Sequence, residues 1–276
     1  MATCVRHPDN EAGRRCTRCG RDACHLCLRQ APVGAHCVEC VRASAPSAAE
    51  SRRVRAALGV RRPWVTSFFV ALNGALFLMT TSAGSGWSMR PAVVRDWTTR
   101  ALPIDRAGEW WRIITGGFLH FDFRHLAMNM VMLYLLGRRL EQRVGASRFA
   151  GLYLCSLLGG SAGALVVAPS AATAGASGAI YGVMGAVYVV ERLAGGDPWR
   201  DGLGSLILVN VMITFLLPGI SIGGHIGGLA VGVMAGAVLG DRRLARRSRA
   251  QVIAWAALAA LAMGSFVVAL AAAAAM

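Results

Sequence analysis

Polar residues at the starts of apolar segments are of the types needed for nucleophilic catalysis. Ser177 opens one apolar segment and His225 opens another, while a third begins with His120, His125 and Asn129. A serine, a base and hydrogen-bond donors are the parts of a serine-type hydrolase, in which the donors stabilise the oxyanion. Because polar side chains are costly inside a bilayer, an intramembrane histidine indicates a functional site. The set predicts proteolysis within a membrane.

Each of these residues also has a simpler interpretation. The run Gly175-Ala176-Ser177-Gly178 is equally typical of small-residue packing between membrane helices. A histidine at the start of an apolar segment is equally typical of a membrane interface. Their joint occurrence favours the functional interpretation, because three of the six histidines lie near the N-terminus and the other three lie in the apolar segments just described.

The composition indicates a membrane protein. The 276 residues are 55% hydrophobic, with a mean hydropathy of +0.50, which fits a bundle of spanning helices better than a water-soluble domain. The net charge of +15 does not indicate a nucleic-acid partner, because the arginines cluster between apolar segments, as in membrane proteins. The chain contains no lysine, which excludes a Ser/Lys dyad.

The chain divides into a polar, cysteine-rich beginning and a hydrophobic remainder. Residues 1–50 are polar, so we expect no N-terminal signal peptide. A membrane span needs about 20 residues. The seven predicted spans are roughly 64–82, 116–136, 149–168, 177–193, 203–218, 223–240 and 251–274. The predicted fold class is therefore an all-α polytopic membrane protein with a small N-terminal domain.

Four segments of the chain follow from this division. They are an N-terminal domain over 1–41, a Ser/Ala/Arg/Pro linker over 42–63, a six-helix core over 64–240, and a basic loop with a seventh transmembrane helix over 241–276. Arginine clusters precede the first span and separate spans two from three, four from five and six from seven, so these regions are expected on the cytoplasmic side. The N-terminus is then cytoplasmic and the C-terminus extracytoplasmic, most simply in the plasma membrane. The arginines of the long first loop, about 83–115, weigh mildly against this orientation.

Glycines in the sixth segment predict which helices pack together. They recur every four residues, at Gly224, Gly228, Gly232, Gly236 and Gly240. Such a stripe lets a second backbone approach closely. The fourth segment has glycines at the same spacing just after Ser177, so packing of the two helices would bring His225 beside the serine. The small, irregular stretch before Ser177 places the serine below the outer surface, at a helix N-terminus.

Eight possible metal ligands lie in the first 40 residues. They form four pairs with x-x spacing: Cys4/His7, Cys16/Cys19, Cys24/Cys27 and Cys37/Cys40. Tetrahedral zinc takes four such ligands, so the set predicts about two structural Zn²⁺ ions. A disulfide framework is the alternative, but thiols stay reduced in the cytoplasm. Too small to bury a core, the domain is expected to need its metal to fold.

The order of the four pairs resembles that of B-box-type cross-braced zinc fingers. The resemblance implies that pairs one and three share one ion and that pairs two and four share the other. His36 is an alternative ligand to Cys37, and His25 is a possible decoy. The role of the domain is left open between binding a cytoplasmic protein partner and redox sensing.

Residues 63–240 resemble the rhomboid family of intramembrane serine proteases. The motifs occur in the family's order: Trp111-Arg112 in the first loop, His120/His125/Asn129, Gly137/Glu141/Gly145 after the second helix, Gly175-Ala176-Ser177-Gly178 as Gly-x-Ser-Gly, Tyr181, and His225 with Gly228 and Gly232 as His-x-x-Gly-x-x-x-Gly. A seventh helix after the six-helix core is a known variant of the family.

The resemblance implies a Ser/His dyad without a catalytic cofactor. Ser177 would attack the scissile carbonyl, with His225 as general base and then acid. His125, Asn129 and the backbone N–H of Ser177 would stabilise the oxyanion. The substrate would be a transmembrane protein whose helix unwinds in the lipid bilayer near the outer leaflet.

Further residues are implied to support this site. Tyr181 would orient the imidazole, His120 would hold water near the mouth, and Gly175 belongs to the motif around the nucleophile. Trp111 and Arg112 match the family's first loop, although a tryptophan and an arginine are also typical of any membrane interface. A structural role was expected for the remaining matches: Glu141 tying down the loop between helices two and three, and Gly228 and Gly232 in helix packing.

Competing functions are disfavoured by the residues present. A proteolytically silent rhomboid-like chaperone or trafficking factor would not need Ser177 and His225. A transporter or channel would need a charged or carbonyl-lined pathway at the membrane midplane. A zinc protease would need His-Glu-x-x-His, which does not occur.

Overall fold

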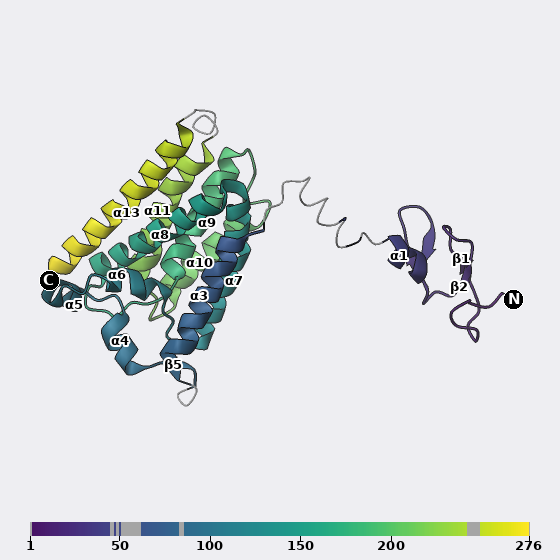
Figure 1. The fold of residues 1–276 in the computed structure, drawn as a ribbon, viewed down its shortest axis with the longest axis horizontal. Helices are drawn as coiled ribbons and strands as arrows, with labels where there is room; N and C mark the ends of the chain where they lie inside the picture. Colours follow the sequence, from purple (N-terminus) through teal and green to yellow (C-terminus); the bar gives the residue numbers. More distant parts are fainter. Residues whose placement is uncertain are drawn as a thin grey trace. The chain divides into compact units, whose positions relative to one another are not determined.

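The computed structural model describes residues 2–44, 47, 50, 62–82, 86–241 and 249–275. The chain divides into two compact units, Met1–Arg61 and Arg62–Met276 (Figure 1). Most of the expected linker over 42–63 and most of the basic loop after 241 lie outside the described residues.

The N-terminal unit is built from two small hairpins and one helix. Strand β1 (Arg14–Arg15) pairs with β2 (Asp22–Ala23), and β3 (Leu28–Gln30) pairs with β4 (Ala35–Cys37), both antiparallel. Helix α1 (Val38–Ser44) follows β4 directly, so it continues past the boundary expected at residue 41.

The second unit is helical. Its long helices are α3 (Trp64–Thr80), α7 (Phe123–Val144), α8 (Ala146–Val167), α9 (Ser177–Leu193), α10 (Leu203–Leu216), α11 (Ile222–Gly240) and α13 (Ala250–Ala274). Each of the seven predicted apolar segments overlaps one of these helices, and α7, α8, α11 and α13 extend beyond the predicted bounds. Within the described residues, α8, α11 and α13 are long and apolar enough to cross a membrane, and α3 and α10 are shorter apolar helices. The second unit therefore has the architecture of a helical, membrane-embedded protein.

The second predicted segment differs most from the structure. It was expected to start at residue 116, but α7 begins at Phe123 and runs on to Val144. The Asp122 side chain accepts a hydrogen bond from the backbone N–H of His125, at 3.0 Å, and this cap sets the start of the helix. Gly116–Phe118 forms a separate 3-10 turn, η2.

The long connection between α3 and α7 is folded rather than irregular. It contains β5 (Thr81–Ser82), β6 (Ser88–Met89), α4 (Pro91–Trp97), α5 (Ala101–Ala107) and α6 (Arg112–Thr115). The β5 and β6 strands form a hairpin. The last helix, α13, packs along α8 and also contacts α5. Figure 1 shows its C-terminal end beside α5, so α13 reaches this connection.

The glycine stripe of α11 packs against α9, as the spacing predicts. A Cβ added at Gly228 would lie within 3.0 Å of the backbone of Gly178, and one added at Gly232 would lie equally close to Gly182. Any larger side chain would therefore push the two helices apart. This close approach places the start of α11 beside the start of α9.

A second glycine contact holds α11 against α8. Added Cβ atoms at Gly223 and Gly227 would collide with the backbone of Gly163 and Gly159. The sequence analysis did not predict this second stripe. Helix α11 is therefore fixed on two sides by backbone contact, and its first turn has little freedom to shift.

Glu141 joins α7 to the beginning of α3. Its carboxylate accepts hydrogen bonds from the backbone N–H groups of Val65 and Thr66, at 3.1 and 2.8 Å, and from the Thr66 hydroxyl at 2.7 Å. We expected this side chain to tie down the loop between the second and third helices. It instead satisfies the free N–H groups at the start of the first helix, where a negative charge is favourable.

An ion-pair cluster lies at the opposite end of α9 from Ser177. Glu191 is buried and pairs with Arg139 at 2.7 Å and with Arg143 at 3.4 Å, both from α7. Arg139 also contacts Asp201 at 3.0 Å. The sequence analysis assigned no role to Glu191. The two ends of α9 therefore have different chemistry, with charges at one end and neutral groups at the other.

Candidate active site

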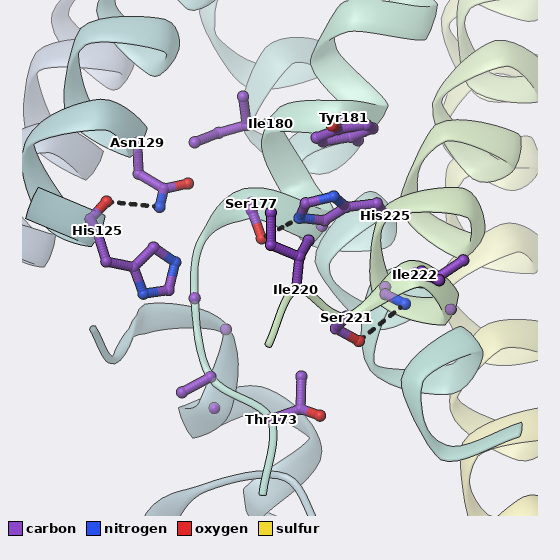
Figure 2. Close-up of a pocket in the computed structure, with 18 of the residues that line it drawn as sticks. His125, Asn129, Thr173, Ser177, Ile180, Tyr181, Ile220, Ser221, Ile222 and His225 are labelled. Atoms are coloured by element: carbon purple, nitrogen blue, oxygen red, sulfur yellow. Dashed lines mark hydrogen bonds between the residues drawn. The ribbon is translucent and has the colours of Figure 1, made fainter. Parts of the chain in front are cut away.

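Ser177 and His225 are hydrogen-bonded to each other. His225 Nε2 lies 2.8 Å from Ser177 Oγ, although the two residues are 48 positions apart. Ser177 is the first residue of α9, and His225 lies in the first turn of α11. The glycine contacts between the two helices bring these starts together (Figure 2). The distance is that of a nucleophile and its base.

The non-helical backbone before Ser177 is hydrogen-bonded to the first loop. Thr173 exchanges two backbone hydrogen bonds of 2.9 Å with Thr99, and the N–H of Gly175 donates to the carbonyl of Gly116 at 2.9 Å. Irregular backbone at membrane depth is tolerated when protein satisfies its polar groups in this way. Gly175 has a φ of 138°, which favours glycine.

His225 is held by contacts on two sides. Its ring stacks on Tyr181, with 4.0 Å between centroids and 18° between planes. Ser221 caps α11 by accepting a hydrogen bond from the N–H of Gly224, at 3.2 Å, and so sets the turn on which the histidine lies. Only 8% of the His225 surface is exposed. The ring is positioned before any substrate arrives.

A threonine that the sequence analysis did not single out contacts the other ring nitrogen. Thr214 Oγ1, on α10, lies 2.8 Å from His225 Nδ1. The same oxygen lies 2.5 Å from the Tyr181 hydroxyl. The imidazole thus has a polar partner on each nitrogen, and neither partner is charged.

His125 and Asn129 lie on the other side of Ser177 from His225 (Figure 2). The side-chain amide of Asn129 donates to the carbonyl of His125 at 2.8 Å, which fixes the direction of the amide. A Cβ added at Gly175 would lie 2.8 Å from His125 Nε2 and 3.5 Å from Ser177 Oγ. The absence of a side chain at Gly175 therefore leaves space between Ser177 Oγ and the His125 ring.

His120 is fully buried beside His125. The two rings are 5.0 Å apart and meet edge to face. Neither ring nitrogen of His120 has a hydrogen-bond partner among the described residues. Buried polar atoms of this kind are normally satisfied, often by ordered water. His120 does not line the cavity around Ser177, so its role in holding water near the mouth stays a prediction.

One cavity joins these residues. It has a volume of about 610 Å³, and its lining includes His125, Asn129, Ser177, Tyr181 and His225. Its walls also include apolar side chains from α7, α8, α9 and α10. A site of low polarity strengthens each hydrogen bond within it.

Trp111 and Arg112 lie outside the cavity and differ from each other. Trp111 is 38% exposed, as expected at a membrane interface, whereas Arg112 is 4% exposed. The Arg112 guanidinium pairs with Glu109 and donates to the carbonyls of Arg95 and Thr98, at 2.7 and 3.3 Å. Arg112 therefore holds the first loop together.

The eight N-terminal ligands form two clusters in the expected pairing. One cluster is Cys4, His7, Cys24 and Cys27, and the other is Cys16, Cys19, Cys37 and Cys40. Within each cluster the ligand atoms lie within 4.8 Å of one another. Of the alternatives considered from the sequence, neither His36 nor His25 belongs to either cluster.

The distances inside the clusters fit a tetrahedral metal better than disulfides. Cys24 Sγ and Cys27 Sγ lie 3.5 and 3.2 Å from His7 Nδ1, and Cys19 Sγ lies 3.7 Å from Cys37 Sγ. Bond lengths of about 2.3 Å to sulfur and about 2.0 Å to nitrogen imply ligand separations of about 3.5 to 3.8 Å. A disulfide would need about 2.05 Å. Each cluster could therefore hold one metal ion.

The supporting residues differ in how visible they were in the sequence. Asp122 and Ser221 each stand at a helix start, where such residues are recognisable caps, yet both were missed. Thr214 had no local signal, because a threonine within an apolar helix usually bonds only to its own helix. Its contact with His225 depends on how α10 lies against α11.

The family model and the similar proteins all indicate the same family. A family model described as "Rhomboid domain" matches residues 107–242. The chain is 32% identical over 175 residues to "Putative rhomboid protease YdcA" of Bacillus subtilis (strain 168), covering 62% of this chain and 85% of that relative. Residues 107–242, matched by the family model, include the whole of α7 to α11.

Other relatives are longer than the matched region. "Rhomboid protease GluP" of Bacillus subtilis (strain 168) is 33% identical over 196 residues, which are 69% of this chain and 38% of that relative. "RHOMBOID-like protein 6, mitochondrial" of Arabidopsis thaliana is 37% identical over 142 residues, which are 49% of this chain and 46% of that relative. The chain spans less than half the length of these two relatives.

Proposed function

Because the chain belongs to the rhomboid family, we propose that it is an intramembrane serine protease that uses Ser177 and His225 as a catalytic dyad. Relatives described as rhomboid proteases support an intramembrane protease. The observation that carries the finer proposal is the 2.8 Å hydrogen bond between Ser177 Oγ and His225 Nε2 inside a cavity.

The proposed reaction begins with proton transfer between these two atoms. Ser177 Oγ attacks the carbonyl carbon of the scissile peptide while its proton passes to His225 Nε2. The protonated His225 then donates that proton to the leaving amine, and an acyl-enzyme remains on the serine. Water, activated by the same nitrogen, attacks the acyl carbon and releases the second product. Tyr181 keeps the imidazole ring in plane through its stacking contact.

The negative charge on the tetrahedral intermediate needs donors on the other side of the serine. His125, Asn129 and the backbone N–H of Ser177 supply them in this proposal. The space that Gly175 leaves open supports the assignment, because an oxyanion needs room beside its donors. Donors in a largely apolar cavity act more strongly than they would in water, which offsets the absence of a third, acidic residue.

The proposed substrates are transmembrane segments of other proteins. A helical peptide bond is shielded, so the substrate must unwind before its carbonyl can reach Ser177. Unwinding is easiest near Gly or Pro and near the membrane surface. The arginine distribution supports a cytoplasmic N-terminus and an extracytoplasmic C-terminus in the plasma membrane, with cleavage near the outer leaflet.

We also propose that the N-terminal unit binds two structural Zn²⁺ ions. The donor set of seven thiols and one imidazole favours zinc among common cytoplasmic metals. The backbone N–H of Cys37 donates to Cys16 Sγ at 3.1 Å, which is a typical outer-shell contact of a bound thiolate. A cytoplasmic protein partner of this unit is part of the proposal.

Labelling with a fluorophosphonate tests the dyad. Full-length protein in lipid should be labelled and should cleave a model transmembrane substrate, whereas Ser177→Ala and His225→Ala should do neither. Ser156→Ala is the matched control, because Ser156 is a buried serine on α8 outside the dyad, and it should behave as wild type. Cleavage by Ser177→Ala at near wild-type rate would refute the nucleophile.

The same assay separates the alternative function. A silent rhomboid-like chaperone or trafficking factor would show no serine-dependent labelling in the wild-type protein and no cleavage of any transmembrane substrate. Labelling of the wild type that depends on His225 is not expected of such a protein.

A further inference from the structure

Thr214 is an unusual residue of α10. The helix runs from Leu203 to Leu216 and is apolar over most of its length. Its buried residues are Leu203 and Gly204 at one end and Thr214 near the other. Thr214 is 1% exposed and is the one polar side chain of α10 in this group. A buried hydroxyl on a mostly apolar helix needs an explanation in terms of its partners.

The hydroxyl of Thr214 has three polar neighbours. Its oxygen lies 2.8 Å from His225 Nδ1, 3.0 Å from the carbonyl of Asn210 and 2.5 Å from the Tyr181 hydroxyl. The Tyr181 hydroxyl itself donates to the Asn210 carbonyl at 2.6 Å. The four groups form one closed cluster that joins α9, α10 and α11.

Counting protons in this cluster assigns a direction to the bond with His225. If Nε2 is to take the proton of Ser177, the neutral ring must carry its own proton on Nδ1. That N–H needs an acceptor. The Thr214 hydroxyl can donate its proton to the Asn210 carbonyl, so an oxygen lone pair stays available for Nδ1–H. The Tyr181 hydroxyl can share its proton between this carbonyl and the second lone pair of the Thr214 oxygen, 2.5 Å away, so the short contact between the two hydroxyls also has a proton.

We propose that Thr214 is a positioning residue for His225: its hydroxyl oxygen accepts the Nδ1–H and so holds the ring tautomer and plane in which Nε2 can take the proton of Ser177. The proposal rests on the proposed Ser/His dyad. It assigns to a neutral side chain the position that an acidic residue occupies in a catalytic triad. Thr214 touches neither substrate nor reacting atoms.

Helix geometry alone does not account for these contacts. A threonine in a membrane helix commonly bonds to the carbonyl four residues earlier, and Thr214 makes that bond to Asn210. Thr80 makes the same bond to Leu76, at 2.7 Å, without a histidine nearby. Thr214 differs because its hydroxyl lies within hydrogen-bond distance of an imidazole nitrogen. This contact requires α10 to pack against α11 with the two side chains facing each other.

Kinetics of the full-length protein on a transmembrane substrate test the proposal. Thr214→Val keeps the shape and removes the hydroxyl, so kcat should fall about tenfold, the size expected for one neutral hydrogen bond, with KM unchanged. Thr214→Ser restores a hydroxyl and should recover most of the rate. Thr80→Val is the matched control, because it removes the same kind of bond to a helix carbonyl, and its kcat should be that of wild type.

Nitrogen-15 NMR of histidine-labelled protein gives a readout that a purely structural role would not change. The His225 signals are identified by their absence from His225→Ala. The wild type should show the Nδ1–H tautomer, and Thr214→Val should show a mixture of tautomers. A wild-type ring protonated on Nε2 would overturn the proposal, and this result does not depend on whether Thr214→Val folds.

Further outcomes distinguish this inference from the proposed dyad. Full kcat in Thr214→Val would overturn the role of Thr214 alone, provided that Ser177→Ala is inactive. An equal loss in Thr214→Val and Thr214→Ser would mean that side-chain shape matters rather than the hydroxyl, which also overturns it. Cleavage by Ser177→Ala would instead refute the dyad itself.

Discussion

The N-terminal unit and the helical unit Arg62–Met276, which we call the membrane unit, are stabilised by different interactions. The buried cluster of the N-terminal unit consists of Cys4, Ala23, Cys24 and Cys27, with Leu28 packed against it, so most of its interior is made of metal ligands. The membrane unit has a large interior of apolar side chains and helix backbones in direct contact. Under the proposed zinc binding, the N-terminal unit depends on a metal ion, whereas the helical unit depends on close packing.

This difference implies that the two units should fail separately. Removing a metal affects only the cysteine-rich unit, because the ligand clusters of the described residues both lie there. Changing a glycine or a buried carboxylate of the helices affects only the membrane unit.

Metal removal should unfold the N-terminal unit and leave the membrane unit folded. Structural zinc contributes about 10–16 kcal/mol to the folding of comparable small domains, more than so small a core can replace. Chelation of the full-length protein should release about two zinc ions and leave cleavage intact, as checked by metal analysis and a protease assay. Cys16→Ser should lose one equivalent, whereas Cys155→Ala, which changes a lone buried thiol on α8, should lose none.

Two results would contradict this prediction. Purified protein without zinc, with its N-terminal thiols oxidised, would refute the metal clusters. Loss of all cleavage after chelation would show that the two units are coupled.

Asn129→Ala should slow the reaction and leave both units folded. Loss of one oxyanion donor typically lowers kcat by about 10²–10³, while the remaining donors still act. Asn73→Ala is the matched control, because the Asn73 amide also donates to the carbonyl four residues earlier, at 2.7 Å, but lies on α3. It should keep the wild-type kcat. A rise in KM with kcat unchanged in Asn129→Ala would show that Asn129 does not serve the oxyanion.

Glu141→Gln should lower the stability of the membrane unit alone. The glutamine keeps one acceptor oxygen but presents an amide to N–H groups at the start of α3 that need an acceptor. Loss of a hydrogen bond to a charged group costs about 1.5–3 kcal/mol. Thermal unfolding in detergent should shift to lower temperature, with the zinc content unchanged.

Asp96→Asn is the control for this carboxylate, because its pair with Arg95 is exposed and contributes little to stability. Equal shifts in unfolding temperature for Glu141→Gln and Asp96→Asn would mean that the contact between Glu141 and α3 stabilises the protein no more than an exposed ion pair.

Gly232→Ala should destabilise the membrane unit by about 1–3 kcal/mol, the usual cost of overpacking. Its Cβ would collide with the backbone of Gly182, whereas a Cβ at Gly74, within α3, would meet nothing within 4 Å. Gly74→Ala should therefore stabilise the helix by up to about 1 kcal/mol. Unfolding temperatures of the two variants should move in opposite directions. If both rise, the backbone contact between α11 and α9 is not tight.

Much of this architecture was predictable, because the relevant signals are local. Apolar segment length predicted the positions of the long helices, and the four-residue spacing of Gly228 and Gly232 predicted a helix contact, since residues at that spacing share one face. The x-x spacing of the cysteine pairs predicted two clusters, because it suits two ligands of one ion. The resemblance to rhomboids then pointed to Ser177 and His225 before any distance was known.

Other features depend on residues that are distant in sequence and have no local pattern. Glu141 bonds to Thr66, 75 positions earlier, and nothing around Glu141 distinguishes the start of α3 from the neighbouring loop as its partner. The observed start of α7 differs from the predicted one, because Asp122 caps the helix and Gly116 belongs to a separate turn. Hydropathy alone therefore misplaced the start of this helix.

The sequence by itself determined which residues could do chemistry and which segments could lie in a membrane, because side-chain type, segment length and helical spacing are properties of short stretches of chain. Tertiary structure decided which groups meet. It placed Ser177 Oγ 2.8 Å from His225 Nε2 and Thr214 Oγ1 2.8 Å from Nδ1. These distances follow from how closely α9, α10 and α11 approach, and that approach depends on packing among all three helices at once.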